Sequence, residues 1–124
     1  MDTLTLPLDH AAIEAVRQLD PEGQDRLLSR LIALYRDDSS QLLADMENAL
    51  KVGDAENVAR AAHTLKSSSA NLGATNVAAI ARQIEHAARG GDLKDLPASV
   101  TKLRAQRTVA LSELEALENS AKVA

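Results

Sequence analysis

The sequence DAENVARAAHTLKSSSANLG, Asp54–Gly73, predicts a single helix with one buried and one exposed face. On a wheel of about 100° per residue, His63 lies about 140° from the centre of an apolar stripe, so its imidazole should face solvent. Ser67 and Ala70 lie on the same face and Lys66 on its flank, which would border the ring with small side chains and one cation. The apolar stripe is made by Val58, Ala62, Leu65, Ser69 and Leu72.

An exposed histidine with these neighbours suits the transfer of a phosphoryl group. A histidine side chain has an ordinary pKa near 6.5 and is mostly neutral at pH 7, so a ring nitrogen keeps a lone pair for attack. A phosphoryl group received there adds about two negative charges. Lys66 is a neighbour of His63 on the helix surface and would offset part of that charge. The alternative is a surface histidine without a function.

The string HTLKSSSANLG, residues 63–73, closely resembles the signature of histidine phosphotransfer (Hpt) domains. These domains carry a His-x-x-Lys-small-x-small pattern, and Gly73 matches the glycine that ends their histidine helix. Ser67 stands where many members have glycine, and serine is also small. The wider pattern of the chain resembles this family over roughly residues 8–115, whereas the specific motif covers only 63–73.

The resemblance implies a four-helix bundle with no catalysis of its own. Its exposed histidine takes a phosphoryl group from an aspartate on one receiver domain and passes it to another. By resemblance, His63 is the phospho-acceptor and Lys66 faces the phosphate, while Mg²⁺ and most of the catalytic apparatus belong to the receiver. Glu85 would orient a ring nitrogen, or else it is a solvated acid between Arg82 and Arg89. No cofactor is expected on this chain.

Length and composition favour one all-α domain. The chain has 124 residues, enough for a single core, and we expect one domain over 1–124 with its core at about 8–118. Aromatic residues amount to 1%, with Tyr35 alone, so the core would be built from small and aliphatic side chains that suit helix packing. We expect an antiparallel up-down four-helix bundle with a short extra N-terminal helix.

Capping residues, glycines and prolines mark the predicted helix ends. Asp9 is a cap, with Leu8 and Ile13 as a hydrophobic staple, and Asp20-Pro21-Glu22 is a second start signal. Residues 1–7 and the tail from about Asn119 should fray. The predicted helices run from Asp9 to about Leu19, from Asp20 to Val52, from Asp54 to Leu72, from about Thr75 to Gly90, and from Pro97 to about Asn119.

The longest predicted helix has two inward stripes separated by the polar run 37–40, and we expect it to continue through that run. In the last helix Arg107 falls inside the apolar stripe, so its side chain should snorkel or find an acid. The stripes of the long helix are Leu27, Leu31, Leu34 and Tyr35, then Leu42, Met46, Ala49 and Leu50. Those of the last two helices are Val77, Ile80, Ala81, Ile84 and Ala88, then Val100, Leu103, Ala110, Leu111, Leu114 and Leu117.

Charge and missing motifs argue against several functions. The net charge of −4 without a basic run disfavours nucleic acid. The lack of an apolar run near 18 residues, with no signal segment, disfavours a membrane and makes the cytoplasm the default. His10, His63 and His86 lie on three helices without a His-x-x-x-His pair, so no metal site is expected. The serines at 67–69 have no base placed beside them, and no glycine-rich loop supports ATP binding.

Together with the resemblance to Hpt domains, these observations predict a monomeric phosphorelay intermediate. Its partner would be the receiver domain of a hybrid sensor histidine kinase, of a response regulator, or both. The docking surface should surround His63, with Ala59, Ala62 and Ala70 as its small apolar part. One alternative is a helical interaction bundle in which His63 has no chemical role. Another is a dimeric phosphotransferase built on a similar bundle.

Overall fold

The computed structural model describes residues 8–24 and 26–123, with side chains as far as Asn119 apart from residue 25. The expected fraying of residues 1–7 lies outside the described residues. Every regular element in these ranges is a helix, which confirms the all-α prediction. The five helices are α1 (His10–Gln18), α2 (Leu27–Lys51), α3 (Ala55–Asn71), α4 (Thr75–Arg89) and α5 (Leu96–Val123).

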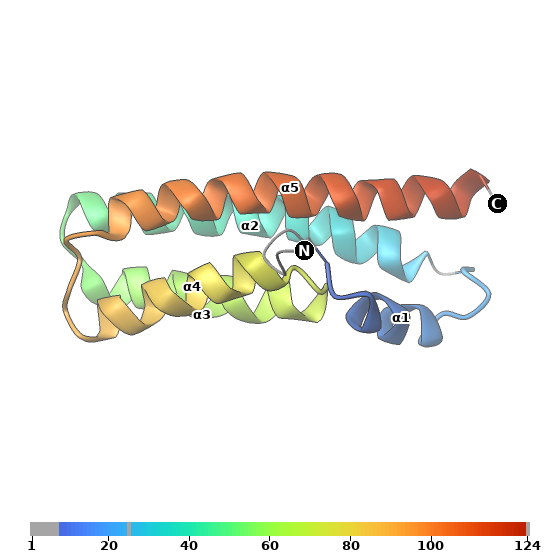
Figure 1. Cartoon of the computed structure of the whole chain (residues 1–124), viewed down its shortest axis with the longest axis horizontal. Coiled ribbons are helices and arrows are strands. Elements are labelled where there is room, and N and C mark those ends of the chain that lie inside the picture. The colour runs from blue at the N-terminus through green and yellow to red at the C-terminus, as the bar shows by residue number, and fades with distance from the viewer. Residues whose placement is uncertain (1–7, 25, 124) are drawn as a thin grey trace, which may run out of the picture.

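The four long helices form an antiparallel up-down bundle, as Figure 1 shows. One layer is made by α2 and α5, and the other by α3 and α4, so each helix has two neighbours in the bundle. The short helix α1 lies beyond the end of the α3–α4 pair and packs on α2. None of the helices in the described ranges combines the length and the apolar character that crossing a membrane requires.

The core runs along the whole bundle and consists of aliphatic side chains from all five helices. Alanines recur among the buried residues of α3 and α4, and small side chains allow two helices to approach closely. The buried alanines of these two helices are Ala59, Ala61, Ala62, Ala81 and Ala88. The predicted stripe of the histidine helix is confirmed, because all five of its residues are buried. Of the predicted α4 stripe, Ile80 alone is only half-buried.

Two backbone features hold α1 to the rest of the bundle. The Asp9 side chain caps α1 as predicted, accepting a hydrogen bond from the Ala11 backbone N–H at 3.0 Å. The Asp9 backbone N–H donates to the carbonyl of Gly73 at 2.7 Å, in the turn between α3 and α4. Leu8 and Ile13 are both buried in the core. The start of α1 is therefore anchored to the end of the histidine helix.

The predicted start of the long helix at Asp20 is wrong, because α2 begins at Leu27. Two residues in the left-handed region separate them: Gly23 has φ +68° and Arg26 has φ +51°. Asp20 still acts as a cap, but across a loop, accepting a hydrogen bond from the Leu27 N–H at 3.1 Å. The predicted start signal Asp20-Pro21-Glu22 therefore lies in the turn between α1 and α2 and not in the first turn of a helix.

The predicted inward face of α2 is partly wrong. Leu34 is 57% exposed, whereas Ile32 and Leu43 are fully buried. The helix continues through the polar run, as expected, and Ser39 from that run is buried. The polar run does not divide the buried face into the two predicted stripes, because α2 has one continuous seam that passes through Ser39. The seam is Ile32, Tyr35, Ser39, Leu43, Met46 and Ala49.

The Arg107 side chain on α5 forms hydrogen bonds with a hydroxyl and a carbonyl of α2 and not with an acid. Its Nε donates to the Ser39 hydroxyl at 2.6 Å, and its Nη2 donates to the Arg36 carbonyl at 2.8 Å. Five of the six residues predicted inward on this helix are buried, and Leu117 is half-buried. The backbone of α5 is helical to Val123, so the expected loosening from about Asn119 is wrong for 119–123.

Candidate functional site

His63 lies in the middle of α3 and projects from the bundle. The Asp54 side chain caps this helix by accepting a hydrogen bond from the Asn57 N–H at 3.2 Å. Burial of the Val58 and Leu65 side chains then sets the rotation of α3 about its axis. The His63 side chain is 54% exposed, so the predicted outward orientation of the imidazole is confirmed.

Glu85 supplies the contact that holds the imidazole ring. It follows Ile84 at the edge of the buried face of α4, and its side chain is only 11% exposed. Its Oε2 lies 2.9 Å from Nδ1 of His63. The alternative of a solvated acid is therefore wrong, because Glu85 is buried against α3 and hydrogen-bonded to the ring.

Two cations neutralise the buried carboxylate of Glu85. Nζ of Lys66 donates to Oε1 at 2.8 Å, while Nε and Nη2 of Arg89 donate to Oε2 at 3.0 and 2.8 Å. The hydrogen bond from Lys66 contributes most to lowering the pKa of Glu85, with further contributions from Arg89 and His63. These outweigh the opposing effect of burial and bring the pKa to about 2. Glu85 is thus an anion at neutral pH.

The ionised state of Glu85 determines which nitrogen of His63 carries the proton. A carboxylate has only acceptor sites, so the hydrogen bond to Nδ1 assigns the proton to that nitrogen. In the neutral imidazole the other nitrogen, Nε2, then carries the lone pair. The result is an oriented ring with a nucleophilic nitrogen opposite the held one, which is an arrangement that can accept a phosphoryl group.

Comparison with known proteins agrees with this geometry. The family model of the Hpt domain matches residues 30–120. This chain belongs to the Hpt domain family. Histidine phosphotransfer in a phosphorelay is the function of the family, so the predicted family and function are confirmed. The alternative of an interaction bundle without chemistry has no support.

A solved Hpt protein has the same overall fold. The crystal structure of histidine-containing phosphotransfer protein B (HptB) from Pseudomonas aeruginosa PAO1 is similar, with a TM-score of 0.81 and 23% sequence identity. The likeness covers 94% of this chain and 97% of that one, so the helical architecture is shared almost from end to end. The comparison with curated proteins found no match.

The small residues predicted around the ring divide into two groups. Ser67 and Ala70 are exposed on α3, where their small side chains stand on the same outer surface as the His63 ring. Ala59 and Ala62 are 1% and 0% exposed, so their predicted place on the docking surface is wrong. They lie on the side of α3 that packs in the bundle core, where a methyl group permits close helix contact.

Arg89 is the residue of this Hpt site that sequence reasoning missed. From the sequence, Arg89 is named only as a cation that flanks Glu85. In the structure Arg89 donates two hydrogen bonds to Glu85, and its side chain is 60% exposed. The signal was its spacing, because residues four apart on a helix are neighbours. His10 and His86 are exposed elsewhere. In the described ranges no three His, Asp or Glu side chains gather as a possible metal site.

Proposed function

We propose that His63 is the phospho-acceptor of this Hpt domain and that the phosphoryl group is carried on Nε2. The observation that carries the proposal is the hydrogen bond between the ionised Glu85 carboxylate and Nδ1 of a half-exposed ring. That bond holds the ring and leaves the Nε2 lone pair for attack. The site residues Lys66, Ser67, Ala70 and Glu85 then serve a single nucleophile.

The transfer step needs no base on this chain. The Nε2 lone pair attacks the phosphorus of an aspartyl phosphate, a P–N bond forms, and the P–O bond to the aspartate breaks to release its carboxylate. The Nδ1 proton stays in its hydrogen bond to Glu85, and the charge gained by the ring is offset by that carboxylate. The reverse sequence hands the group to a second aspartate.

The partner is the receiver domain of a hybrid sensor histidine kinase, of a response regulator, or both. The receiver supplies Mg²⁺ and the groups that stabilise the transferring phosphoryl, since this chain contributes a nucleophile and nearby cations. A relay intermediate must bind and release its partners quickly, which fits a modest contact area and a monomeric state. Sizing in solution tests the monomer, and a stable dimer would contradict it.

The experiment that tests the site is label transfer from a phosphorylated receiver domain in the presence of Mg²⁺. Wild-type protein should acquire an acid-labile, base-stable label, as expected of a phosphoramidate. His63→Gln should acquire none. His86→Gln is the matched control, because His86 is an exposed histidine on α4, and it should label like wild type. Label that survives in His63→Gln would overturn the assignment.

A further inference from the structure

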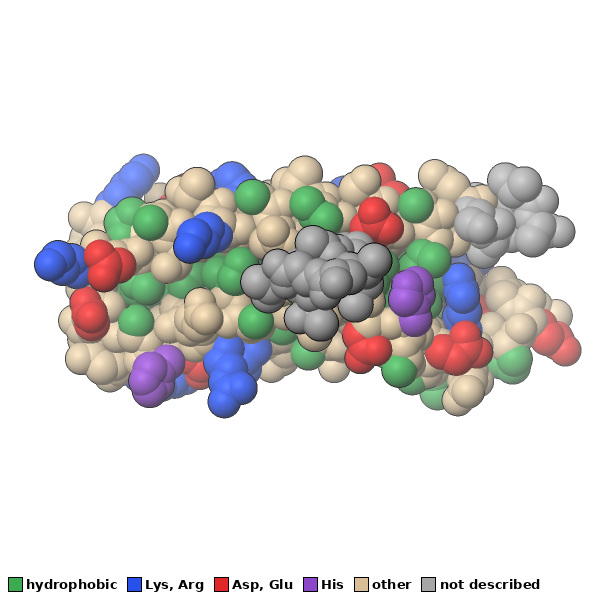
Figure 2. Space-filling view, in the orientation of Figure 1, with side chains coloured by type: hydrophobic (Ala, Val, Ile, Leu, Met, Phe, Trp, Pro, Cys, Tyr) green, Lys and Arg blue, Asp and Glu red, His purple; other side chains and the backbone are tan. Residues whose placement is uncertain are grey.

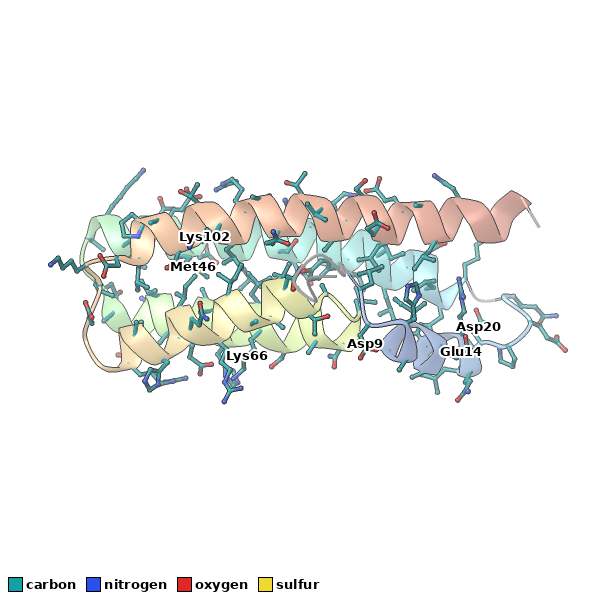
Figure 3. The ribbon with its side chains drawn as sticks, in the orientation of Figure 1. Asp9, Glu14, Asp20, Met46, Lys66 and Lys102 are labelled. Atoms are coloured by element: carbon teal, nitrogen blue, oxygen red, sulfur yellow. The ribbon has the colours of Figure 1, made fainter. Side chains whose placement is uncertain are left out.

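Three cations line the exposed seam between α3 and α4 beside the histidine. Lys66 and Arg89 are bound to Glu85, and Arg82 lies one helical turn before Glu85 on α4. Residues three apart are neighbours on a helix, so Arg82 belongs to the same flank. Figure 3 places Lys66 at the edge of the α3–α4 layer, and Figure 2 shows Lys and Arg side chains gathered at that edge. We name Lys66, Arg82 and Arg89 the cationic seam.

The cationic seam contrasts with the charge of the whole chain. The seam holds three positive charges, and Glu85, which pairs with two of them, holds one negative charge, so two positive charges are in excess. The chain as a whole carries −4. Positive potential is therefore concentrated beside the proposed nucleophile, although the protein is acidic.

Arg82 differs from the other two cations in its surroundings. It is exposed, and among residues 8–24 and 26–119 it forms no ion pair. Lys66 and Arg89 are instead directed to Glu85 and thus to the imidazole. A guanidinium without an ion-pair partner can reorient toward carboxylate or phosphate oxygens on an approaching surface. Its planar shape allows two parallel hydrogen bonds to such a group.

The chemistry of the partner's reacting face makes it anionic. A phosphorylated aspartate brings about two negative charges. Magnesium is held at such sites by one or two carboxylates together with phosphate oxygens, so its two positive charges do not cancel all of the negative charge of these groups. A surface of this kind would be repelled by most of an acidic protein and attracted by the cationic seam.

We propose that the cationic seam is the docking surface for the anionic face of a receiver domain around its phospho-aspartate, and that Arg82 acts in docking. The inference rests on the proposed function of His63 and adds a residue to it. Steering by charge raises the rate of encounter and weakens with ionic strength, whereas the chemical step after docking depends on the groups at the ring.

The test compares two charge reversals that change the net charge equally. Arg82→Glu reverses the charge at the position of the seam that forms no ion pair with Glu85. Lys102→Glu is the control, because Lys102 is an exposed cation on α5, which Figure 3 shows in the opposite layer. Phosphotransfer from an acetyl-phosphate-labelled receiver domain with Mg²⁺ is followed over a range of receiver concentrations, at low and high salt. The receiver is one that labels wild-type protein.

The expected result is a loss of second-order rate without a loss of maximal rate. At low salt Arg82→Glu should lower kcat/KM about fivefold, since steering contributes about tenfold or more in total to such encounters. The rate at saturating receiver should stay within about twofold of wild type, and the difference should vanish at about 0.5 M salt. Lys102→Glu should behave like wild type.

Three results would overturn the inference. They are an unchanged kcat/KM in Arg82→Glu, an equal loss in Lys102→Glu, and a loss confined to the maximal rate. In each case wild-type protein still takes the label, so the proposed function stands. A wild-type protein that takes no label from any receiver overturns the proposed function, and this inference with it.

Discussion

Replacing Gly73 by alanine should destabilise the protein through two separate effects. Gly73 has φ +76°, a left-handed conformation that costs an L-residue about 1 kcal/mol. A Cβ built on Gly73 would lie closer to the Asp9 backbone oxygen than two such atoms can approach. Backbone must therefore move at a contact that also contains the hydrogen bond from the Asp9 N–H to the Gly73 carbonyl.

The expected loss is about 3 kcal/mol. The left-handed conformation accounts for about 1 kcal/mol, the hydrogen bond between Asp9 and Gly73 for about another, and displacement of the packed start of α1 for a similar amount. Leu8 and Ile13 are both buried beside this contact, so α1 cannot shift without disturbing core packing.

Gly53→Ala provides the matched control. Gly53 has φ +69°, yet a Cβ there would meet nothing within 4 Å. This variant carries the conformational cost alone and should lose about 1 kcal/mol. Urea unfolding followed by circular dichroism gives both free energies of unfolding, and the difference between the variants should be about 2 kcal/mol. Equal losses would refute the role assigned to the Asp9 contact.

Two further predictions concern the site. The pKa of Glu85 is about 2, below its ordinary value of 4.5, so ionised Glu85 stabilises the native state above about pH 4.5 and this contribution is lost as the pH falls toward 2. Acid titration of the free energy of unfolding should therefore be less steep in Glu85→Gln than in wild type, and parallel curves would contradict the assignment. Lys66→Ala should keep the helical content but lower the equilibrium yield of phosphohistidine up to about fivefold, since a partly exposed ion pair contributes up to about 1 kcal/mol; a wild-type yield would mean that Lys66 does not act on the phosphate.

The histidine helix could be predicted from sequence because its own residues determine its orientation. Its stripe is regular, Asp54 caps it, and Gly53 ends the preceding helix, so the exposure of His63 follows from local signals. The long helix α2 was harder. Ser39 is polar by type but buried, and its hydroxyl donates to the Arg36 carbonyl at 3.4 Å and accepts a hydrogen bond from Arg107 of α5. A partner 68 residues away leaves no local signal.

The buried hydroxyl of Ser69 shows the same limit. The sequence predicts Ser69 only as a member of the apolar stripe of the histidine helix. In the structure its Oγ also forms a 2.7 Å hydrogen bond with the Tyr35 hydroxyl inside the core, and burial raises the pKa of Tyr35. Both polar groups are buried and satisfied by each other, which links α2 to α3 at one defined register.

The contact between His63 and Glu85 depends on the registers of two helices, and the turn that joins them determines their relative position. Residues 63 and 85 are separated by the last turns of α3, by Gly73 and by the first turns of α4. Gly73 adopts the left-handed conformation that ends α3, and its carbonyl is held by Asp9. A residue bulkier than glycine at position 73 would change where α4 begins and would displace the Glu85 carboxylate from Nδ1 of His63. The histidine and the glycine of the motif therefore depend on one geometry, since the first supplies the proposed nucleophile and the second positions the carboxylate that contacts its ring.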